Sequence, residues 1–104
     1  MATVAIIPFS GSSLCVAVTI PVSSWCPITH EPQTGSTITF RYTPESCVLD
    51  ILDLSWLVPT AQWPRDLEAA AVYLQEQARA VLGVSVSIAA RFVLASGVVI
   101  ECQN

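Results

Sequence analysis

The chain has 104 residues, of which 53% are hydrophobic and only 12% are charged. This composition excludes an intrinsically disordered chain, and the length predicts one domain over residues 1–104. The formal net charge is −4, with eight acidic side chains against four basic ones. The chain therefore lacks the basic surface with which proteins bind nucleic acid. Its apolar content exceeds what one small core hides, which predicts self-association.

The first residues do not have the pattern of a signal peptide or a membrane anchor. They contain no basic side chain, and their apolar run is interrupted at Pro8. No segment approaches the roughly 20 apolar residues that a membrane-spanning helix needs. We expect a cytoplasmic protein without membrane contact. Residues 1–22 are predicted to supply a strand, and their further role is left open.

The cysteines do not predict a metal site. Cys15, Cys26, Cys47 and Cys102 are widely spaced, and His30 is the only histidine. A zinc site needs more closely spaced ligands, and disulfides are not expected without a secretory signal. We expect buried or reactive thiols, and no metal.

Two strands are predicted in the first half of the chain. Residues 13–20 are rich in β-branched side chains and end at Pro21. Residues 36–42 alternate strictly, with large apolar side chains on one face and threonine or arginine on the other. Between the two strands lies a polar loop over residues 23–35.

The clearest predicted element is a helix over residues 65–82. Apolar side chains recur there at three- and four-residue steps, which is typical of an amphipathic helix. Pro64 and Asp66 are favourable at its start and Gly83 at its end. Pro44 is interpreted as another helix start, and residues 48–58, which are too apolar for periodicity to decide, as a short buried helix.

A hairpin is predicted to end the chain. Residues 84–92 alternate again, and Ser96-Gly97 turns the chain into residues 98–102. The order of elements predicts an α+β fold, ββααββ, with a mostly antiparallel four-stranded sheet and helices on one face. Its edge strands carry little charge, so we expect the sheet to continue into a neighbouring copy.

Cys26 is the candidate nucleophile. It follows a predicted strand and precedes a proline, where the chain turns and a thiol can face a ligand. A cysteine attacks as its thiolate and needs a proton acceptor, and His30 and Glu31 are within reach by sequence. The alternative is a half-buried structural cysteine beside a polar turn.

Glu68 is the second candidate. It lies in the first turn of the long predicted helix, outside the apolar stripe. A carboxylate held there can accept two hydrogen bonds from the N–H edge of a guanine-like or pterin-like ring. The alternative is a favourable interaction with the helix dipole alone.

The segment Cys-Pro-Ile-Thr-His-Glu-Pro at residues 26–32, with the strand that ends in Arg-Tyr-Thr-Pro at residues 41–44, resembles the QueF-type nitrile reductases of the tunnelling-fold (T-fold) superfamily. The spacing of 42 residues from Cys26 to Glu68 is similar to the family's spacing from its nucleophile to the glutamate that anchors the deazaguanine ring. The final hairpin is also similar, and the resemblance covers about residues 23–102.

In this family the cysteine adds to the nitrile carbon of 7-cyano-7-deazaguanine, and NADPH reduces the resulting thioimide. The resemblance makes Cys26 the nucleophile and Glu68 the ring anchor. The family's proton-donating aspartate aligns with Gln33. The resemblance therefore implies that this catalytic role is lost or has moved to His30 or Glu31.

Further departures concern the cofactor. After Val48 the reductases carry a lysine-containing segment that contributes to substrate and NADPH binding, whereas this chain has Asp50 and apolar residues. Leu67 stands where the reductases have a histidine before the anchoring glutamate. The resemblance assigns Val48, Asp50 and Leu67 to substrate-binding positions and implies no bound cofactor.

A QueF-like branch of the family converts the nitrile to an amidine with ammonia, in the biosynthesis of queuosine- or archaeosine-type bases. This branch is the preferred interpretation, with a homo-oligomeric barrel whose sites lie between subunits. Whether the substrate is a free small molecule or is carried by transfer RNA stays open. The alternatives are an NADPH-dependent 7-cyano-7-deazaguanine reductase and a catalytically lapsed T-fold module for purine or pterin binding or for assembly.

Overall fold

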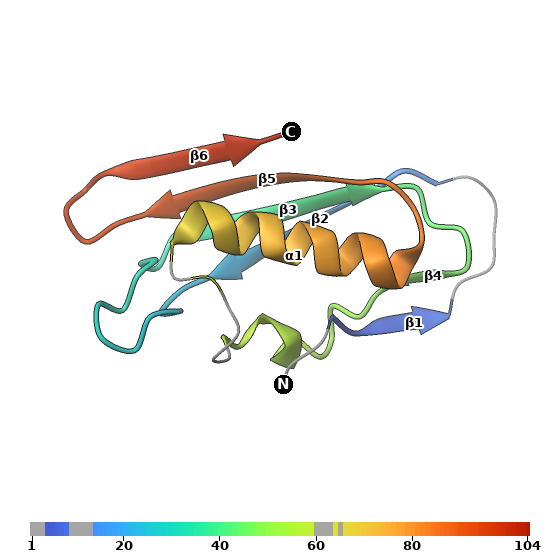
Figure 1. The fold of residues 1–104 in the computed structure, drawn as a ribbon, viewed down its shortest axis with the longest axis horizontal. Coiled ribbons are helices and arrows are strands. Elements are labelled where there is room, and N and C mark those ends of the chain that lie inside the picture. Colours follow the sequence, from blue (N-terminus) through green and yellow to red (C-terminus); the bar gives the residue numbers. More distant parts are fainter. Residues whose placement is uncertain (1–3, 9–13, 60–63, 65) are drawn as a thin grey trace.

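A four-stranded antiparallel sheet forms one layer of the structure (Figure 1). The structure is a computed structural model that describes residues 4–8, 14–59, 64 and 66–104. The sheet order is β2-β3-β5-β6, and every neighbouring pair is antiparallel. Its strands are β2 (Val16–Val22), β3 (Ser36–Tyr42), β5 (Val86–Val93) and β6 (Val99–Gln103). The predicted strands and the closing hairpin are confirmed within two or three residues at each end.

The alternation of β3 fixes which face of the sheet is buried. Ile38, Phe40 and Tyr42 point into the core, and Arg41 is exposed on the other face. Because successive side chains of a strand point to opposite faces, the small polar residues between them cover the outer face. There Thr19 Oγ1 lies 2.8 Å from Thr39 Oγ1 across β2 and β3.

Strand β2 runs through Pro21, where the sequence predicted its end. Pro21 lies opposite Thr37 in the register, and the strand continues to Val22. The reason is its position, because β2 is an edge strand of the described sheet, and among the described residues no strand pairs with its outer side and needs an N–H donor there.

Helix α1 (Leu67–Leu82) covers the buried face of the sheet (Figure 1). Asp66 Oδ1 accepts a hydrogen bond of 2.7 Å from Ala69 N at its start, and Gly83 closes it with φ +71°. This left-handed conformation is one that glycine adopts without a steric penalty. The predicted helix and both of its end residues are confirmed, except that residue 65 lies outside the described part of the chain.

One buried polar side chain of α1 holds the end of the chain. Gln75 and Asn104 exchange two side-chain hydrogen bonds of 3.0 Å, and Gln75 Nε2 also donates to Val86 O at 2.7 Å. Asn104 Oδ1 accepts a further bond from Ile88 N at 3.2 Å. The amide pair therefore joins α1 to β5 and satisfies polar atoms that the core would otherwise leave unpaired.

Residues 48–58 do not form the predicted helix. They contribute to β4 (Cys47–Leu49), which pairs with β1 (Ile6–Pro8), and to a 3₁₀ turn, η1 (Ser55–Leu57). Pro44 likewise starts no helix and is buried in the connection before β4.

Side-chain hydrogen bonds explain this difference. Asp50 Oδ1 accepts from Leu52 N and Asp53 N at 3.0 and 3.2 Å, and Asp53 Oδ1 accepts from Ser55 N at 3.1 Å. The bonds from Ser55 lower the pKa of Asp53. Aspartates that bond to nearby backbone N–H groups favour turns over a continuous helix.

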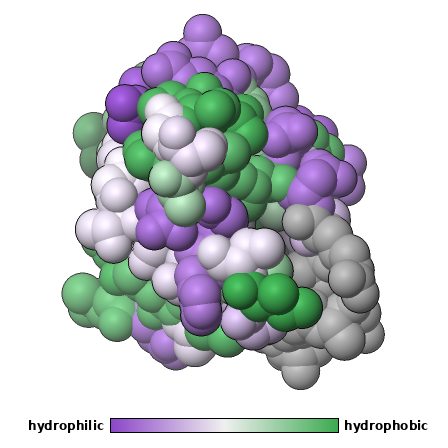
Figure 2. Space-filling view, turned by 90° about the vertical axis from the view of Figure 1, so that its left-hand side faces the viewer, coloured by the Kyte–Doolittle hydropathy of each residue, from purple (hydrophilic) through white to green (hydrophobic). Residues whose placement is uncertain are grey.

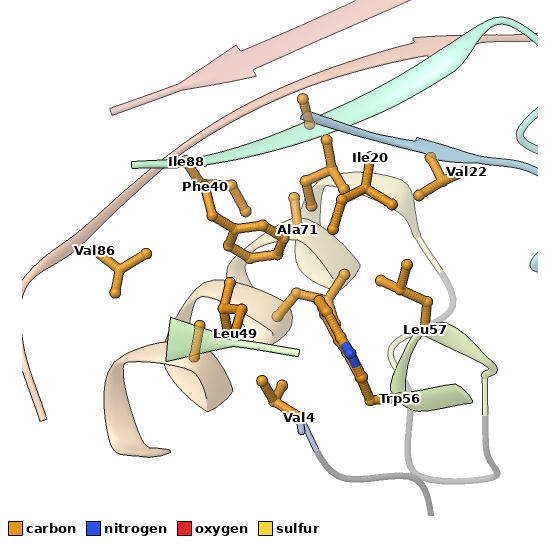
Figure 3. Packing of buried hydrophobic residues seen from close by; sticks show 14 of the residues in the cluster. Val4, Ile20, Val22, Phe40, Leu49, Trp56, Leu57, Ala71, Val86 and Ile88 are labelled. Atoms are coloured by element: carbon orange, nitrogen blue, oxygen red, sulfur yellow. The ribbon is translucent and has the colours of Figure 1, made fainter. Parts of the chain in front are cut away.

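The core between the sheet and α1 is mostly aliphatic, and Phe40 and Trp56 pack against each other within it (Figure 3). Phe40 meets Trp56 edge to face, with ring centroids 5.9 Å apart, and Trp56 Nε1 donates to Asp50 O at 3.1 Å. The Tyr42 hydroxyl accepts a bond of 3.0 Å from Leu49 N. Burial raises the pKa of Tyr42 above its ordinary value, so the neutral phenol joins the sheet to β4.

The α+β class and the antiparallel four-stranded sheet with helical cover on one face are thus confirmed. One α-helix, rather than two, lies on this face within the described residues. None of the helices in that part of the chain has the length and apolar character needed to cross a membrane.

Candidate functional site

The loop between β2 and β3 is held in a narrow, closed conformation. Ser24 N donates to Pro32 O at 2.7 Å, Cys26 N to Glu31 O at 3.0 Å, and His30 N to Cys26 O at 2.8 Å. Ser24 and His30 have positive φ angles of 55° and 59°. These bonds fold the segment back on itself, so that Cys26 lies beside Glu31 in the backbone pairing.

The thiol of Cys26 is partly buried at the turn of this loop. Thr29 N lies 3.5 Å from its sulfur and donates a hydrogen bond to it. A backbone N–H that points at sulfur stabilises negative charge there, because the charged form accepts the stronger bond. The loop therefore supplies one hydrogen-bond donor to the sulfur of Cys26.

Two contacts fasten the loop to the hairpin of β5 and β6. Glu31 Oε1 accepts a bond of 2.9 Å from Ala95 N. Ser36 Oγ, fully buried, accepts from Val93 N and donates to Gln33 O, both at 2.8 Å. The position of the loop is therefore set by residues about 60 positions later in the chain.

A groove of about 890 Å³ opens between this loop, the start of α1 and the β5–β6 hairpin. Figure 2 shows this end of the molecule, where hydrophobic and hydrophilic surface alternate. Among the described residues that line the groove, the charged ones are all acidic. The lining comprises Ser24, Trp25, Cys26, Pro27, Ile28, Thr29, Glu31, Pro59, Pro64, Asp66, Leu67, Glu68, Ala70, Leu94 and Ile100.

Glu68 lies on the α1 side of this groove. Its side chain is exposed in the first turn of the helix, two residues after the capping Asp66. The pKa of Cys102 on β6 is raised, chiefly by burial and further by the negative charge of Glu68. The negative charge of Glu68 therefore acts on β6, although Cys102 itself does not line the groove.

The predicted site residues divide into two groups. Cys26, Leu67 and Glu68, which are distant in the sequence, all line the groove. The side chains of His30 and Gln33 do not line it, although both residues belong to the same loop. His30 is exposed, and Gln33 Nε2 donates to His30 O at 3.1 Å.

Val48 and Asp50 lie elsewhere in the subunit. Val48 pairs with Ile7 in the two-stranded sheet, and Asp50 N donates to Ala5 O at 2.8 Å. The carboxylate of Asp50 accepts hydrogen bonds from the backbone N–H groups of Leu52 and Asp53. In this chain, therefore, these two side chains are structural parts of the β1–β4 region.

The groove also contains residues that sequence reasoning did not place at a site. Trp25 packs edge to face on Phe92, with centroids 5.6 Å apart, and Ile100 lines the opposite wall. In the sequence, only the neighbouring Cys26 could have indicated that Trp25 lines a site. In the described part of the chain, no group of three or more His, Cys, Asp or Glu side chains is placed to hold a metal ion.

Comparison with known proteins does not assign this chain to a family. No family model matches this chain, and no curated protein matches it. The function is therefore argued from the groove itself.

Proposed function

We propose that the chain is a QueF-like T-fold protein that binds a 7-deazaguanine-type base in the groove and attacks its nitrile with Cys26. The observation that supports this most is the meeting of Cys26 and Glu68 in one groove, although 42 residues separate them in the sequence. A candidate nucleophile and a candidate ring acceptor then face the same ligand.

The chemistry of the walls fits a flat heterocycle that donates hydrogen bonds. The side chains of Trp25, Leu67 and Ile100 offer apolar surface for the faces of the ring. Glu68 offers two carboxylate oxygens, which can accept from adjacent N–H and NH₂ groups. Ligand pockets of this kind combine mostly apolar walls with a few polar groups that fix orientation.

The reaction that we propose ends at an amidine. The sulfur of Cys26 bonds to the nitrile carbon, and the nitrile nitrogen takes up a proton, which gives a thioimide. Ammonia then adds to the same carbon and the carbon–sulfur bond breaks, which returns the thiol and leaves the amidine. No electrons are transferred, so the reaction needs ammonia and no reductant.

The reductase alternative needs NADPH. Its phosphates require cationic partners, and the described charged residues of the groove are Glu31, Asp66 and Glu68. Carboxylates repel phosphate, so this groove favours a small neutral or cationic ligand over a dinucleotide. The lapsed binding module is the remaining alternative, and the position of Gln33 outside the groove favours it.

Intact-mass spectrometry after incubation with 7-cyano-7-deazaguanine tests the proposal. The proposed enzyme gains the mass of one ligand, and ammonia then releases the ligand as the amidine. Binding without a mass change supports the lapsed module, and loss of NADPH absorbance supports the reductase. Absence of binding contradicts all three.

We propose further that subunits join side by side into a ring. β2 and β6 are the two edges of the sheet, each with one unpaired backbone side within the described structure. Val99 on β6 is 40% exposed, and Ile28 in the loop at the same end is 83% exposed. β2 carries no charged side chain and β6 carries only Glu101, and edges with so little charge pair readily with another copy. Sedimentation velocity at micromolar concentration is expected to show a species of several subunits, and a stable monomer would contradict both the ring and the T-fold.

Replacing Glu68 with glutamine is expected to weaken binding of 7-cyano-7-deazaguanine by roughly 5- to 150-fold, or about 1–3 kcal/mol. The amide presents N–H to the N–H edge of the ring and leaves buried donors unpaired. Titration calorimetry in a Cys26→Ala background measures binding without the adduct. Glu76→Gln, an exposed position on the same helix, is the matched control and should bind as the parent does. If both variants bind the ligand equally well, Glu68 does not hold the ring and acts only through its interaction with the helix dipole.

A further inference from the structure

The addition of a thiol to a nitrile needs a group that moves a proton from sulfur to nitrogen. The sequence offers three candidates for this role in the Cys26 loop, namely His30, Glu31 and Gln33. The structure distinguishes them, because only Glu31 lines the groove that contains Cys26. His30 is exposed and Gln33 is bonded to the backbone of its own loop.

The two carboxylate oxygens of Glu31 have different surroundings. Oε1 is fixed by the hydrogen bond from Ala95 N at 2.9 Å. Oε2 is buried and has no hydrogen-bond partner in the described part of the structure. It is the only such buried side-chain oxygen or nitrogen among the described residues. A buried acceptor without a donor is costly to a fold, which indicates a functional reason for its retention.

The backbone brings this carboxylate to the side of the nucleophile. Cys26 N donates to Glu31 O, so the two residues are paired across the closed loop. Thr29 N donates to the sulfur from within the same turn. Cys26 and Glu31 therefore belong to one closed loop and both line the groove, although no hydrogen bond joins the thiol to Oε2.

We infer that Glu31 is the acid–base residue of the Cys26 site, and this inference rests on the proposed function. The carboxylate accepts the thiol proton through Oε2 as sulfur bonds to the nitrile carbon, and the carboxyl group delivers that proton to the nitrile nitrogen. The thioimide forms, the carboxylate is regenerated, and no proton is gained or lost. Oε2 has no hydrogen bond to the thiol in the described structure, so the carboxylate turns toward the sulfur for this step.

Glu31→Gln is the test variant, because the amide keeps an oxygen for Ala95 N but cannot carry a proton. The matched controls are His30→Asn, which suits the left-handed backbone there, and Gln33→Ala. The first measurement is the pH profile of Cys26 alkylation by iodoacetamide, localised by peptide mass spectrometry. The second is the rate at which the intact protein gains the mass of 7-cyano-7-deazaguanine.

The pH profile of alkylation tests whether the charge of Glu31 acts on the Cys26 thiol, and this test needs no nitrile. The acidic groups that line the groove with Cys26 are Glu31, Asp66 and Glu68. A neighbouring negative charge disfavours the thiolate, so Glu31→Gln is expected to move half-maximal alkylation to lower pH, by about half a unit or more. The controls should leave the profile in place, and an unchanged profile in Glu31→Gln would overturn the inference.

The adduct rate tests the proton transfer. Glu31→Gln is expected to slow adduct formation about 100-fold or more, the usual range for loss of a general acid–base group. The controls should stay within about threefold of the parent. An equal rate in Glu31→Gln would overturn the catalytic role while leaving the proposed function intact. If the parent binds no nitrile but the alkylation profile shifts, the proposed function fails and the pairing of Glu31 with Cys26 stands.

Discussion

Cys26→Ser is expected to abolish the covalent adduct with 7-cyano-7-deazaguanine completely, while binding changes by no more than about twofold. The serine hydroxyl occupies nearly the same volume, but it does not ionise near neutral pH and is a poor nucleophile without a strong base. Intact-mass spectrometry reads the adduct, and titration calorimetry reads binding.

Cys15→Ser is the matched control for this variant. Cys15 and Cys26 lie just outside opposite ends of β2, and Cys15 is exposed. A strand of this length spans roughly 20 Å, so a ligand in the groove cannot reach both thiols. Cys15→Ser should form the adduct as the parent does. An adduct that survives in Cys26→Ser and disappears in Cys15→Ser would contradict the placement of the site.

The other two cysteines are poor competitors for the nitrile. Cys47 is buried in β4, and its thiol donates a weak bond to Val81 O at 3.7 Å. Burial, with the negative charge of Glu68, raises the pKa of Cys102 above its ordinary value of 9.0. Near neutral pH its thiolate is therefore scarcer than that of an exposed cysteine, which makes a single adduct per chain the expected result.

The elements that the sequence predicted correctly are those whose signals are local. α1 carries an apolar stripe and suitable residues at both ends, Asp66 and Gly83. β3 alternates without interruption, and Gly97 has the positive φ of 89° that its hairpin turn requires. Each of these features is decided within a few residues of itself, so periodicity and turn chemistry suffice.

The elements that the sequence missed depend on distant partners. β1 and β4 have three residues each, and Ile7 meets Val48 only after the chain between them has folded. An apolar run such as residues 48–58 fits a helix and a strand equally well until its partners are known. The backbone conformation of this run is set by hydrogen bonds to the carboxylates of Asp50 and Asp53 and by the pairing with β1.

In the candidate site too, some features are visible in the sequence and others depend on contacts between distant residues. The sequence indicated Cys26 and Glu68, and the structure places them at one groove. The sequence could not indicate that Oε2 of Glu31 lacks a hydrogen-bond partner. The position of this carboxylate depends on the bond from Ala95 N, 64 residues later in the chain. The sequence left the proton-transfer role open between His30 and Glu31, and the choice of Glu31 rests on the contact of the loop with the β5–β6 hairpin.

The segment that leads to the groove from the β4 side depends on one large side chain. Trp56 is 1% exposed and lies beneath the sheet against Phe40 (Figure 3). Its Nε1 donates to Asp50 O, which closes the turn before η1. Pro59, a lining residue of the groove, follows η1 by two residues. Trp56 thus connects the core to the wall of the site.

Trp56→Ala is expected to lower the free energy of unfolding by about 3–5 kcal/mol, because it leaves a large cavity under Phe40 and removes the edge-to-face contact. Trp56→Phe keeps a ring there and should lose only about 1 kcal/mol, the usual value of the missing hydrogen bond. Leu52→Ala, at a position that is 93% exposed, should stay within about 0.5 kcal/mol of the parent. Urea titration followed by far-ultraviolet circular dichroism measures all three variants. If Trp56→Ala unfolds no more easily than Leu52→Ala, Trp56 does not anchor η1 and the wall of the groove is held by other contacts.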